Sequence, residues 1–270
     1  RGKSEIKNNI KYVNWNAKTF SGWEEELENT DVVINLDGKS VDCRYTEKNK
    51  TEILASRIDS TKILNEAILQ CKNPPKHFIN SSTATIYRHS EDKEMDEYTG
   101  EIGNDFSMNV AKTWEKTFYE VETQKTLKTA IRTSIVLGKN GGAFIPLKRL
   151  TQLGLGGKNG NGSQFVSWIH EKDFARAVEF IIEKELSGCI NVVSPLPVRN
   201  EEFMKKLQKE IGIPFGLLIS KSMLEIGARI IKTETELVLK SRNVIPKRLT
   251  ENGFEFQFGD IDKTFKNLLS

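Results

Sequence analysis

Two apolar strands joined by one helix constrain this chain more than any other feature of its sequence. Residues 32–36 form a continuous apolar run that suits a strand buried on both faces, and this run ends at a turn on Gly38. A segment with helical periodicity follows, and the chain returns to an apolar run at 77–80. The segment carries one apolar face made by Ile53, Leu54, Ile58, Leu64, Ala67 and Ile68. A strand, a helix and a returning strand form a βαβ unit, which predicts a parallel sheet.

The remainder of the chain alternates between strands and helices in the same way. Further strands are predicted at residues 10–15, 129–138, 165–170 and 189–194. Further helices are predicted at residues 21–29, 107–123, 145–152, 173–185 and 200–211, with an apolar helix after residue 217. Ser107 and Asn200 are the expected N-caps, and Gly212 is expected to end the last of the bounded helices. The pattern indicates the α/β class.

Composition and charge exclude several classes of protein. Hydrophobic residues make up 37% of the chain and charged residues 29%, as in a soluble globular protein. The 40 basic and 37 acidic residues are mixed, and no basic stripe with interleaved aromatic residues indicates a nucleic-acid partner. No apolar run approaches the ~20 residues of a membrane span. The three cysteines (43, 71 and 189) and three histidines (77, 89 and 170) are isolated, so we expect a cytoplasmic protein without a metal site.

Three consecutive hydroxyl residues, Ser81, Ser82 and Thr83, end the strand that begins at residue 77. In an open α/β sheet, ligands bind just beyond the carboxyl ends of the strands, so hydroxyls at this place indicate a polar binding site. The alternative is a turn in which the serine and threonine side chains bind their own backbone.

Several common motifs are incomplete in this sequence. Residues 38–40, Gly-Lys-Ser, follow a strand as the end of a P-loop would, but Val33 stands where that loop requires glycine. The glycines between Gly154 and Gly162 form no Gly-x-Gly-x-x-Gly pattern and are better interpreted as a flexible loop. The sequence contains no Gly-x-Ser-x-Gly elbow. Nucleoside triphosphatases and serine hydrolases are therefore disfavoured.

Four motifs along the chain resemble the extended and atypical branch of the short-chain dehydrogenase/reductases. They are Val32-Val33-Ile34-Asn35-Leu36-x-Gly38, Ser81-Ser82-Thr83-Ala84-x-x-Tyr87, Arg132-Thr133-x-Ile135-Val136-Leu137-Gly138 and Trp168-Ile169-His170-x-x-Asp173. Two later motifs, at residues 191–203 and 244–249, resemble the YfcH-like epimerase family, which has a short DUF1731-type C-terminal domain. The resemblance implies a Rossmann-like doubly wound parallel sheet in an NAD(P)-binding domain at 1–195, followed by a small substrate-side domain at 196–270.

The resemblance is incomplete at the start of the chain. Family members begin with a strand, a Gly-x-x-Gly-x-x-Gly turn, a helix and a second strand, which hold the cofactor pyrophosphate at the helix N-terminus. This sequence starts after that unit, so the first βαβ unit, of roughly 30 residues, is absent, and we interpret the sequence as a truncated form. Arg1 falls where the family places a basic residue that favours NADP(H) over NAD(H).

The usual catalytic pair of the superfamily is also missing. In Tyr-x-x-x-Lys the lysine charge lowers the pKa of the tyrosine, which can then exchange a proton while the cofactor exchanges a hydride. The tyrosines are at positions 12, 45, 87, 98 and 119, and the residues four positions later are Asn16, Asn49, Glu91, Ile102 and Thr123. Alignment with the family helix places the pair at Ser107 and Ala111, neither of which can perform this chemistry.

The resemblance assigns roles to individual residues. The implied cofactor-binding residues are Arg1, Asn35, Leu36, Gly38, Lys39, Arg44, Ser81, Ser82, Arg132, Thr133 and Ile135. Thr83 matches the catalytic Ser/Thr that hydrogen-bonds a substrate carbonyl, and the substrate side is implied to hold Tyr87, Trp168, His170, Arg199 and Arg242. Lys39 and Arg44 could instead be solvated cations. His170 could be a core residue whose contact with Asp173 steadies the start of a helix.

Three hypotheses on function follow. The first is an NADP(H)-binding protein of the short-chain dehydrogenase/reductase type, acting as a nucleotide-sugar-type epimerase or as an oxidoreductase on a small molecule. The second is a catalytically silent nucleotide sensor or scaffold, since Tyr-x-x-x-Lys is missing. The third is a fragment without a ligand. A homodimer through paired apolar helices is common in the superfamily, but no residue here marks that face.

Overall fold

A four-stranded parallel sheet forms the centre of the computed structural model, which describes residues 4–214, 216 and 240–270. Its strands lie in the order β10-β5-β4-β3, and all neighbours are parallel. Their bounds are Val32–Asn35 (β3), His77–Thr83 (β4), Leu127–Thr133 (β5) and Gly188–Val192 (β10). Helix α1, Glu47–Gln70, connects β3 to β4, so the predicted βαβ unit is confirmed.

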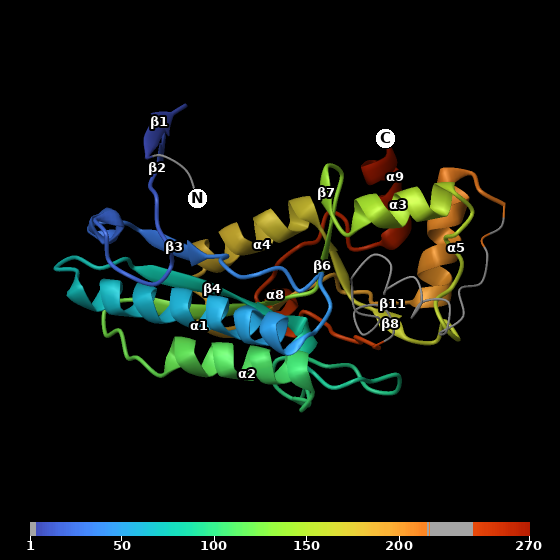
Figure 1. Ribbon diagram of the computed structural model, residues 1–270. Coiled ribbons are helices and arrows are strands. Elements are labelled where there is room, and N and C mark those ends of the chain that lie inside the picture. The colour runs from blue at the N-terminus through green and yellow to red at the C-terminus, as the bar shows by residue number, and fades with distance from the viewer. Residues whose placement is uncertain (1–3, 215, 217–239) are drawn as a thin grey trace.

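Helices cover both faces of this sheet (Figure 1). Helices α1 and α2 (Phe106–Tyr119) pack on one face, where Phe78 and Ala130 belong to a core with Ile68 and Phe118. Helix α4, Glu171–Glu183, packs on the other face, where the core includes Ile79, Ile131 and Ile181. Because side chains alternate along a strand, neighbouring residues of β4 and β5 serve opposite cores. The three-layer α/β fold of Rossmann type is therefore confirmed.

The predicted strands at 129–138 and 165–170 are each divided between two sheets. Strand β5 ends at Thr133, and β6 (Ile135–Gly138) joins a second sheet with β9 (Trp168–His170) and β7 (Gly141–Gly142). Strand β8, Phe165–Val166, pairs with β11, Val198–Arg199. Ser167 separates β8 from β9 because its hydroxyl donates to the carbonyl of Arg242 at 2.6 Å and accepts from the amide of Val244 at 3.0 Å. A single apolar run in the sequence gave no sign of these breaks.

Both expected N-caps, Ser107 and Asn200, are wrong by one or two residues. Asp105, rather than Ser107, caps α2, since its carboxylate accepts from the amide of Met108 at 3.0 Å. Asn200 is the first residue of α5, Asn200–Ile211, and Arg199 is its N-cap; the Asn200 side chain instead accepts from the amide of Asn159 at 2.8 Å. Gly212 ends α5 in the left-handed region, at φ 82°, as expected.

The C-terminal part of the chain packs on the same cores as the strands before it. Helix α9, Ile261–Leu269, lies against α5, and both share a core with β6, β9 and helix α3, Phe144–Gln152. Helix α8, Lys247–Glu251, packs on β10. The apolar helix predicted after residue 217 falls largely on residues 217–239, outside the described residues. The proposed division of the chain at residue 195 stays a prediction.

The described N-terminal residues form a small hairpin of β1, Glu5–Lys7, and β2, Ile10–Tyr12, which stands away from the sheet (Figure 1). A short 3-10 helix, Trp23–Leu27 (η1), follows where a helix was predicted.

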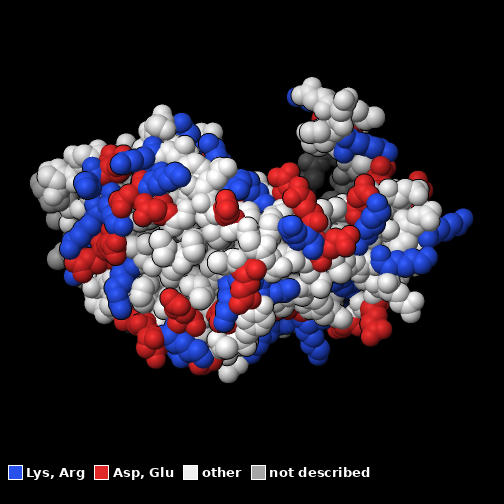
Figure 2. All heavy atoms as spheres, turned by 180° about the vertical axis from the view of Figure 1, so that it is seen from behind, with Lys and Arg blue, Asp and Glu red and all other residues white. Residues whose placement is uncertain are grey.

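Figure 2 shows acidic and basic side chains interspersed over the face opposite to the view of Figure 1. In the part of the chain that the structure describes, every helix is too short or too polar to cross a membrane.

Two buried histidines make the fold sensitive to acid. The Nε2 atom of His77 lies 2.7 Å from the hydroxyl of Thr129, and Nδ1 of His170 accepts from the amide of Lys172 at 3.0 Å. Burial lowers the pKa of both histidines below 6.5. These two histidines therefore bind protons more readily in the unfolded chain than in the folded one. Their contribution to the free energy of unfolding is fully present above pH 6.5 and is lost as the pH falls below that value.

We therefore expect urea unfolding to give a lower free energy of unfolding at pH 5.5 than at pH 7.5. The variant H77Q should make this difference smaller, because it removes one of the two buried imidazoles. Equal stability of the parent protein at the two pH values would contradict the assignment.

Candidate functional site

The carboxyl ends of β3, β4 and β5 gather most of the residues predicted to bind a cofactor. Asn35 pairs with Asn80 in the register of β3 and β4, and Thr83 pairs with Thr133 in the register of β4 and β5. Ile135, which is 36% exposed, opens β6 two residues after β5 ends. Asn35, Thr83 and Thr133 therefore lie at one edge of the four-stranded sheet, as predicted, and Ile135 begins a strand of the second sheet. Arg1 lies outside the described residues.

Asn35 shapes the turn after β3 from the inside. Its side chain is buried, its amide nitrogen donates to Asn80 Oδ1 at 2.8 Å, and its Oδ1 accepts from the amide of Asp37 at 3.0 Å. Leu36, by contrast, is 64% exposed. The residue that presents a side chain outwards at this turn is thus Leu36, while Asn35 fixes the backbone.

The turn at Gly38 and Lys39 is held against helix α1. The Lys39 amide donates to Ser56 Oγ at 2.9 Å, and the Arg57 guanidinium donates to the Lys39 carbonyl at 3.1 Å. A Cβ at position 38 would lie 3.2 Å from Arg57 Cζ, so glycine permits this close approach. The Lys39 ammonium forms an ion pair with Glu52. The Lys39 side chain is therefore held against helix α1, next to the turn that is predicted to contact the adenosine end of a cofactor.

Arg57 was not predicted from the sequence, although from helix α1 it contacts this turn. Its guanidinium stacks on Trp114 with Cζ 5.1 Å from the ring centroid. Burial lowers the pKa of Arg57. The predicted Arg44 follows in the next loop, where its carbonyl accepts from Asn49 Nδ2 at 2.7 Å.

Thr83 and its neighbours on β5 supply the hydroxyls at the strand ends. Thr83 Oγ1 accepts from the amide of Thr85 at 3.1 Å and so caps the short 3-10 helix η2, Ala84–Ile86. This bond leaves the Thr83 hydroxyl proton available as a donor. The hydroxyls of Thr133 and Ser134 are buried and find no hydrogen-bond partner within the described residues, and the same holds for Ser107 Oγ. Buried hydroxyls without a partner are uncommon in folded proteins, which marks this edge as a place for a polar ligand.

Ser82, Arg132 and Tyr87 face the interior instead of this edge. Glu115 of α2 accepts two bonds from the Arg132 guanidinium, each at 2.8 Å, and one from the Ser82 hydroxyl at 2.7 Å. Arg132 also donates to the Tyr87 hydroxyl at 2.8 Å, which in turn donates to Asn191 Oδ1 at 3.0 Å. We refer to Ser82, Tyr87, Glu115, Arg132 and Asn191 as the Glu115 network. The side chains predicted to contact a cofactor or substrate at positions 82, 87 and 132 are thus engaged within the protein.

The environment of Tyr87 prevents it from replacing the missing catalytic tyrosine. Burial raises the pKa of Tyr87 to about 12, although the charge of Arg132 acts in the opposite direction. The phenol therefore stays protonated near neutral pH, and its side chain is only 1% exposed.

Glu115 was missed by the sequence analysis, although the sequence carries a sign of it. It lies four residues after Ala111 and three before Phe118, both of which are buried on α2. Helical periodicity therefore places its carboxylate on the apolar face, where a charge requires a partner.

Trp168 and His170 belong to the core. Both are fully buried, and Trp168 Nε1 donates to the carbonyl of Leu196 at 3.2 Å. His170 caps helix α4, its ring stacks on Phe258 at 4.0 Å between centroids, and its Nε2 lies 3.1 Å from Asn267 Oδ1. His170 therefore steadies the helix start as predicted, but its side-chain partner is Asn267 rather than Asp173.

The Asp173 carboxylate has another function. It accepts from the amides of Gln257 and Phe258 at 3.0 and 2.7 Å, and so anchors the segment before α9 to the start of α4.

The two predicted substrate-side arginines both contact Phe165, Arg199 through its side chain and Arg242 through its backbone. The Arg199 guanidinium lies 4.5 Å from the Phe165 ring centroid and donates to the carbonyl of Ser163 at 2.6 Å. The Arg242 amide donates to the carbonyl of Phe165 at 2.8 Å.

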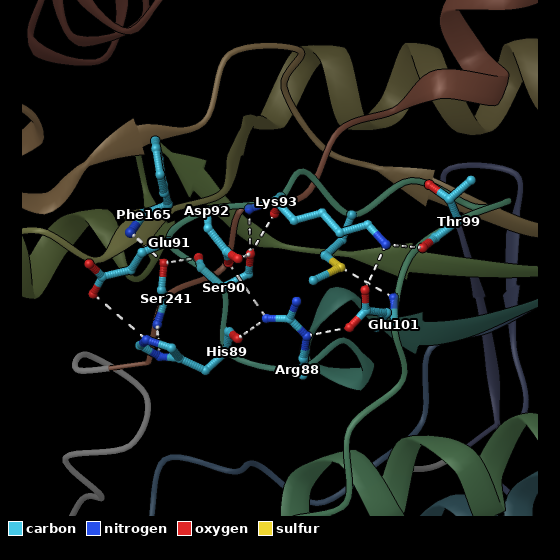
Figure 3. A network of polar contacts seen from close by, with 11 residues as sticks. Arg88, His89, Ser90, Glu91, Asp92, Lys93, Thr99, Glu101, Phe165 and Ser241 are labelled. Atoms are coloured by element: carbon cyan, nitrogen blue, oxygen red, sulfur yellow. Dashed lines mark hydrogen bonds and ion pairs between the residues drawn. The ribbon is translucent and has the colours of Figure 1, made fainter.

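The loop that follows η2 is tied to the C-terminal segment at Ser241 (Figure 3). Ser241 Oγ accepts from the amide of Phe165 at 2.8 Å and donates to the carbonyl of Ser90, while the Ser241 amide donates to His89 Nδ1 at 3.0 Å. Within this loop the pKa of Glu101 is lowered to about 2, mainly by a hydrogen bond from Arg88 and, as the second largest effect, by a hydrogen bond from Lys93. These contacts place residues 88–101 and residues 240–245 side by side.

Comparison with known proteins identifies the family. The NAD dependent epimerase/dehydratase family matches residues 3–192, and a domain of unknown function, DUF1731, matches residues 221–268. The chain belongs to the NAD dependent epimerase/dehydratase family. Epimerase family protein YfhF of Bacillus subtilis is 32% identical over 266 residues, which are 97% of this chain and 85% of YfhF. The predicted resemblance to epimerases with a DUF1731-type domain is thus confirmed.

Solved structures of this family share the fold. Human epimerase family protein SDR39U1 (isoform 2), solved with NADPH, is similar with a TM-score of 0.83 and 27% identity, covering 91% of this chain and 85% of that one. A nucleoside-diphosphate sugar epimerase from Corynebacterium glutamicum is similar with a TM-score of 0.76 and 26% identity, covering 98% of this chain and 51% of that protein.

The residues at the strand ends of this epimerase/dehydratase family member fit one half of a nicotinamide dinucleotide. The orphan hydroxyls of Thr133 and Ser134, and the free proton of Thr83, suit a carboxamide or ribose hydroxyl group. Within the described residues, no glycine-rich turn between a strand and a helix is placed to hold the pyrophosphate. Among residues 4–214, 216 and 240–270, no group of three or more His, Cys, Asp or Glu is placed to hold a metal ion.

Proposed function

We propose that this protein binds NADP(H) at the carboxyl edge of its sheet and acts as an epimerase or oxidoreductase on a small, nucleotide-sugar-type molecule. The proposal rests on two buried hydroxyls at the end of β5, those of Thr133 and Ser134, which lie beside Thr83 and find no hydrogen-bond partner among the described residues. Support comes from SDR39U1, which was solved with NADPH, and from the nucleoside-diphosphate sugar epimerase of C. glutamicum.

Within this proposal we assign the following roles to the chain's own residues. The nicotinamide, when bound, supplies hydride transfer. Thr83 donates its free hydroxyl proton to a substrate carbonyl, and Thr133 and Ser134 orient the carboxamide. We assign Arg199 and Arg242 to the substrate side, where arginine charge would suit an anionic sugar nucleotide; the guanidinium of Arg199 lies over the Phe165 ring, and the backbone amide of Arg242 donates to the Phe165 carbonyl.

Cofactor binding is tested by isothermal titration of the full-length protein with NADPH and with NADH. We expect NADPH to bind at least about tenfold more tightly, which corresponds to about 1.4 kcal/mol. Failure of both nucleotides to bind would remove the proposal.

Lys39 is the residue that we expect to contribute to the preference for the 2′-phosphate. The variant K39A should bind NADPH about tenfold more weakly, since a charge-assisted hydrogen bond is lost, while the affinity for NADH stays the same. The matched control is K50A, because Lys50 forms a similar ion pair with Glu47 on the same helix. If K39A weakens both nucleotides equally, the preference does not arise from Lys39.

A second candidate function is that of a catalytically silent nucleotide sensor or scaffold. It is favoured by the absence of Tyr-x-x-x-Lys and by the internal position of Tyr87. The two functions are separated by following the absorbance of the cofactor in two screens. Keto-sugar nucleotides, which can accept hydride, are mixed with the NADPH-loaded protein, and hydroxyl-sugar nucleotides, which can donate hydride, are mixed with the NADP+-loaded protein. A change in the redox state of the cofactor in either screen excludes the silent sensor.

A further inference from the structure

The Glu115 network holds both flanks of the turn that carries Thr83. Ser82 lies directly before Thr83 and is bound to Glu115, while Tyr87 lies directly after η2 and is bound to Arg132. Between these two tethers the Thr85 amide donates to Thr83 Oγ1, the Tyr87 amide donates to the carbonyl of Ala84 at 3.4 Å, and the carbonyl of Ile86 accepts from the Gly103 amide at 3.0 Å. The network therefore holds the side-chain ends of the turn against α2 and β5, in addition to the β4–β5 ladder that reaches Thr83.

The network is built to be rigid. Ser82, Tyr87, Glu115, Arg132 and Asn191 are each at most 8% exposed. The carboxylate of Glu115 and the guanidinium of Arg132 make two parallel bonds, an arrangement that fixes the orientation of both groups. The Arg132 guanidinium also stacks on the Tyr87 ring, with Cζ 5.1 Å from its centroid.

The side chains of the network and those of the proposed site lie on opposite faces of the same strands. Ser82 and Arg132 point to the face that α2 covers, and the residues that follow them, Thr83 and Thr133, point to the opposite face because side chains alternate. A displacement of the backbone at position 82 or 132 is thus transmitted directly to the next hydroxyl.

We propose that Ser82, Tyr87, Glu115 and Arg132 are positioning residues for the nicotinamide end of the cofactor. This inference rests on the proposed function. In this proposal the network places the hydroxyls of Thr83 and Thr133. It takes no part in binding the adenosine end of the cofactor, which the proposed function places at the turn after β3.

The test compares NADPH with 2′,5′-ADP, which carries only the adenosine end of the cofactor. The variants S82A and Y87F each release one flank of the turn and leave the ion pair of Glu115 and Arg132 in place. We expect each variant to raise the Kd for NADPH about tenfold, which equals about 1.4 kcal/mol, and to leave the Kd for 2′,5′-ADP within about twofold.

The variant Y119F is the matched control. The Tyr119 hydroxyl also bridges α2 and β5, since it accepts from the Ala130 amide at 3.0 Å, but it holds no part of the Thr83 turn. Y119F should lower the midpoint of thermal unfolding without changing the ratio of the two affinities. The inference is overturned if S82A and Y87F weaken both ligands equally, or neither. Failure of the parent protein to bind NADPH would instead overturn the proposed function.

Discussion

Replacing Glu115 by alanine is expected to lower the free energy of unfolding by about 3–5 kcal/mol. The substitution leaves the Arg132 guanidinium in the interior without its counter-ion. Burial alone would lower the pKa of Arg132, but the hydrogen bonds and charge of Glu115 raise it, so the arginine stays charged in the fold. An uncompensated buried charge costs far more than the hydrogen bonds that the alanine variant loses. Urea denaturation at neutral pH measures the effect.

Two further variants make this expectation specific. Lys116 is exposed on the same helix, and K116A should change stability by at most about 0.5 kcal/mol. The double variant E115M/R132M removes both charges and should be more stable than E115A. A cost for E115A no greater than that of K116A would show that Arg132 finds another partner or reaches solvent.

The substitution of Trp168 by alanine is expected to cost about 3–5 kcal/mol. Trp168 is fully buried in the core that joins β9 and α3 to α5 and α9, and its loss leaves a cavity as well as an unpaired carbonyl at Leu196. Thermal or urea unfolding of W168A gives the measurement.

Leu153 provides the control for this second substitution. Its side chain is 74% exposed, so L153A should change the free energy of unfolding by no more than about 0.5 kcal/mol. If W168A were as mild as L153A, the indole would not be a core residue, and the substrate-side role implied by its motif would regain support.

The main features of the fold were predictable because they depend on local pattern. The apolar run at 32–36 and the periodic segment of α1 specify a strand and a helix whatever surrounds them. The breaks at Ser134 and Ser167 were not predictable, since a strand that changes sheets keeps the same apolar pattern while its partners change. The N-cap of α2 was misplaced because Asp105 and Ser107 are both good caps, and only packing selects between them.

The sequence by itself determined that a parallel sheet forms, that hydroxyls end β4 and β5, and that no tyrosine has a lysine four residues later. These properties are local or compositional. Only the tertiary structure decided that Ser82 and Arg132 point away from the proposed site while Thr83 and Thr133 remain at it. The alternation of side chains along a strand fixes which residues share a face. Which helix covers that face is decided by the tertiary structure. Here α2 covers it, and the carboxylate of Glu115 on α2 forms the ion pair that holds Arg132 in the interior.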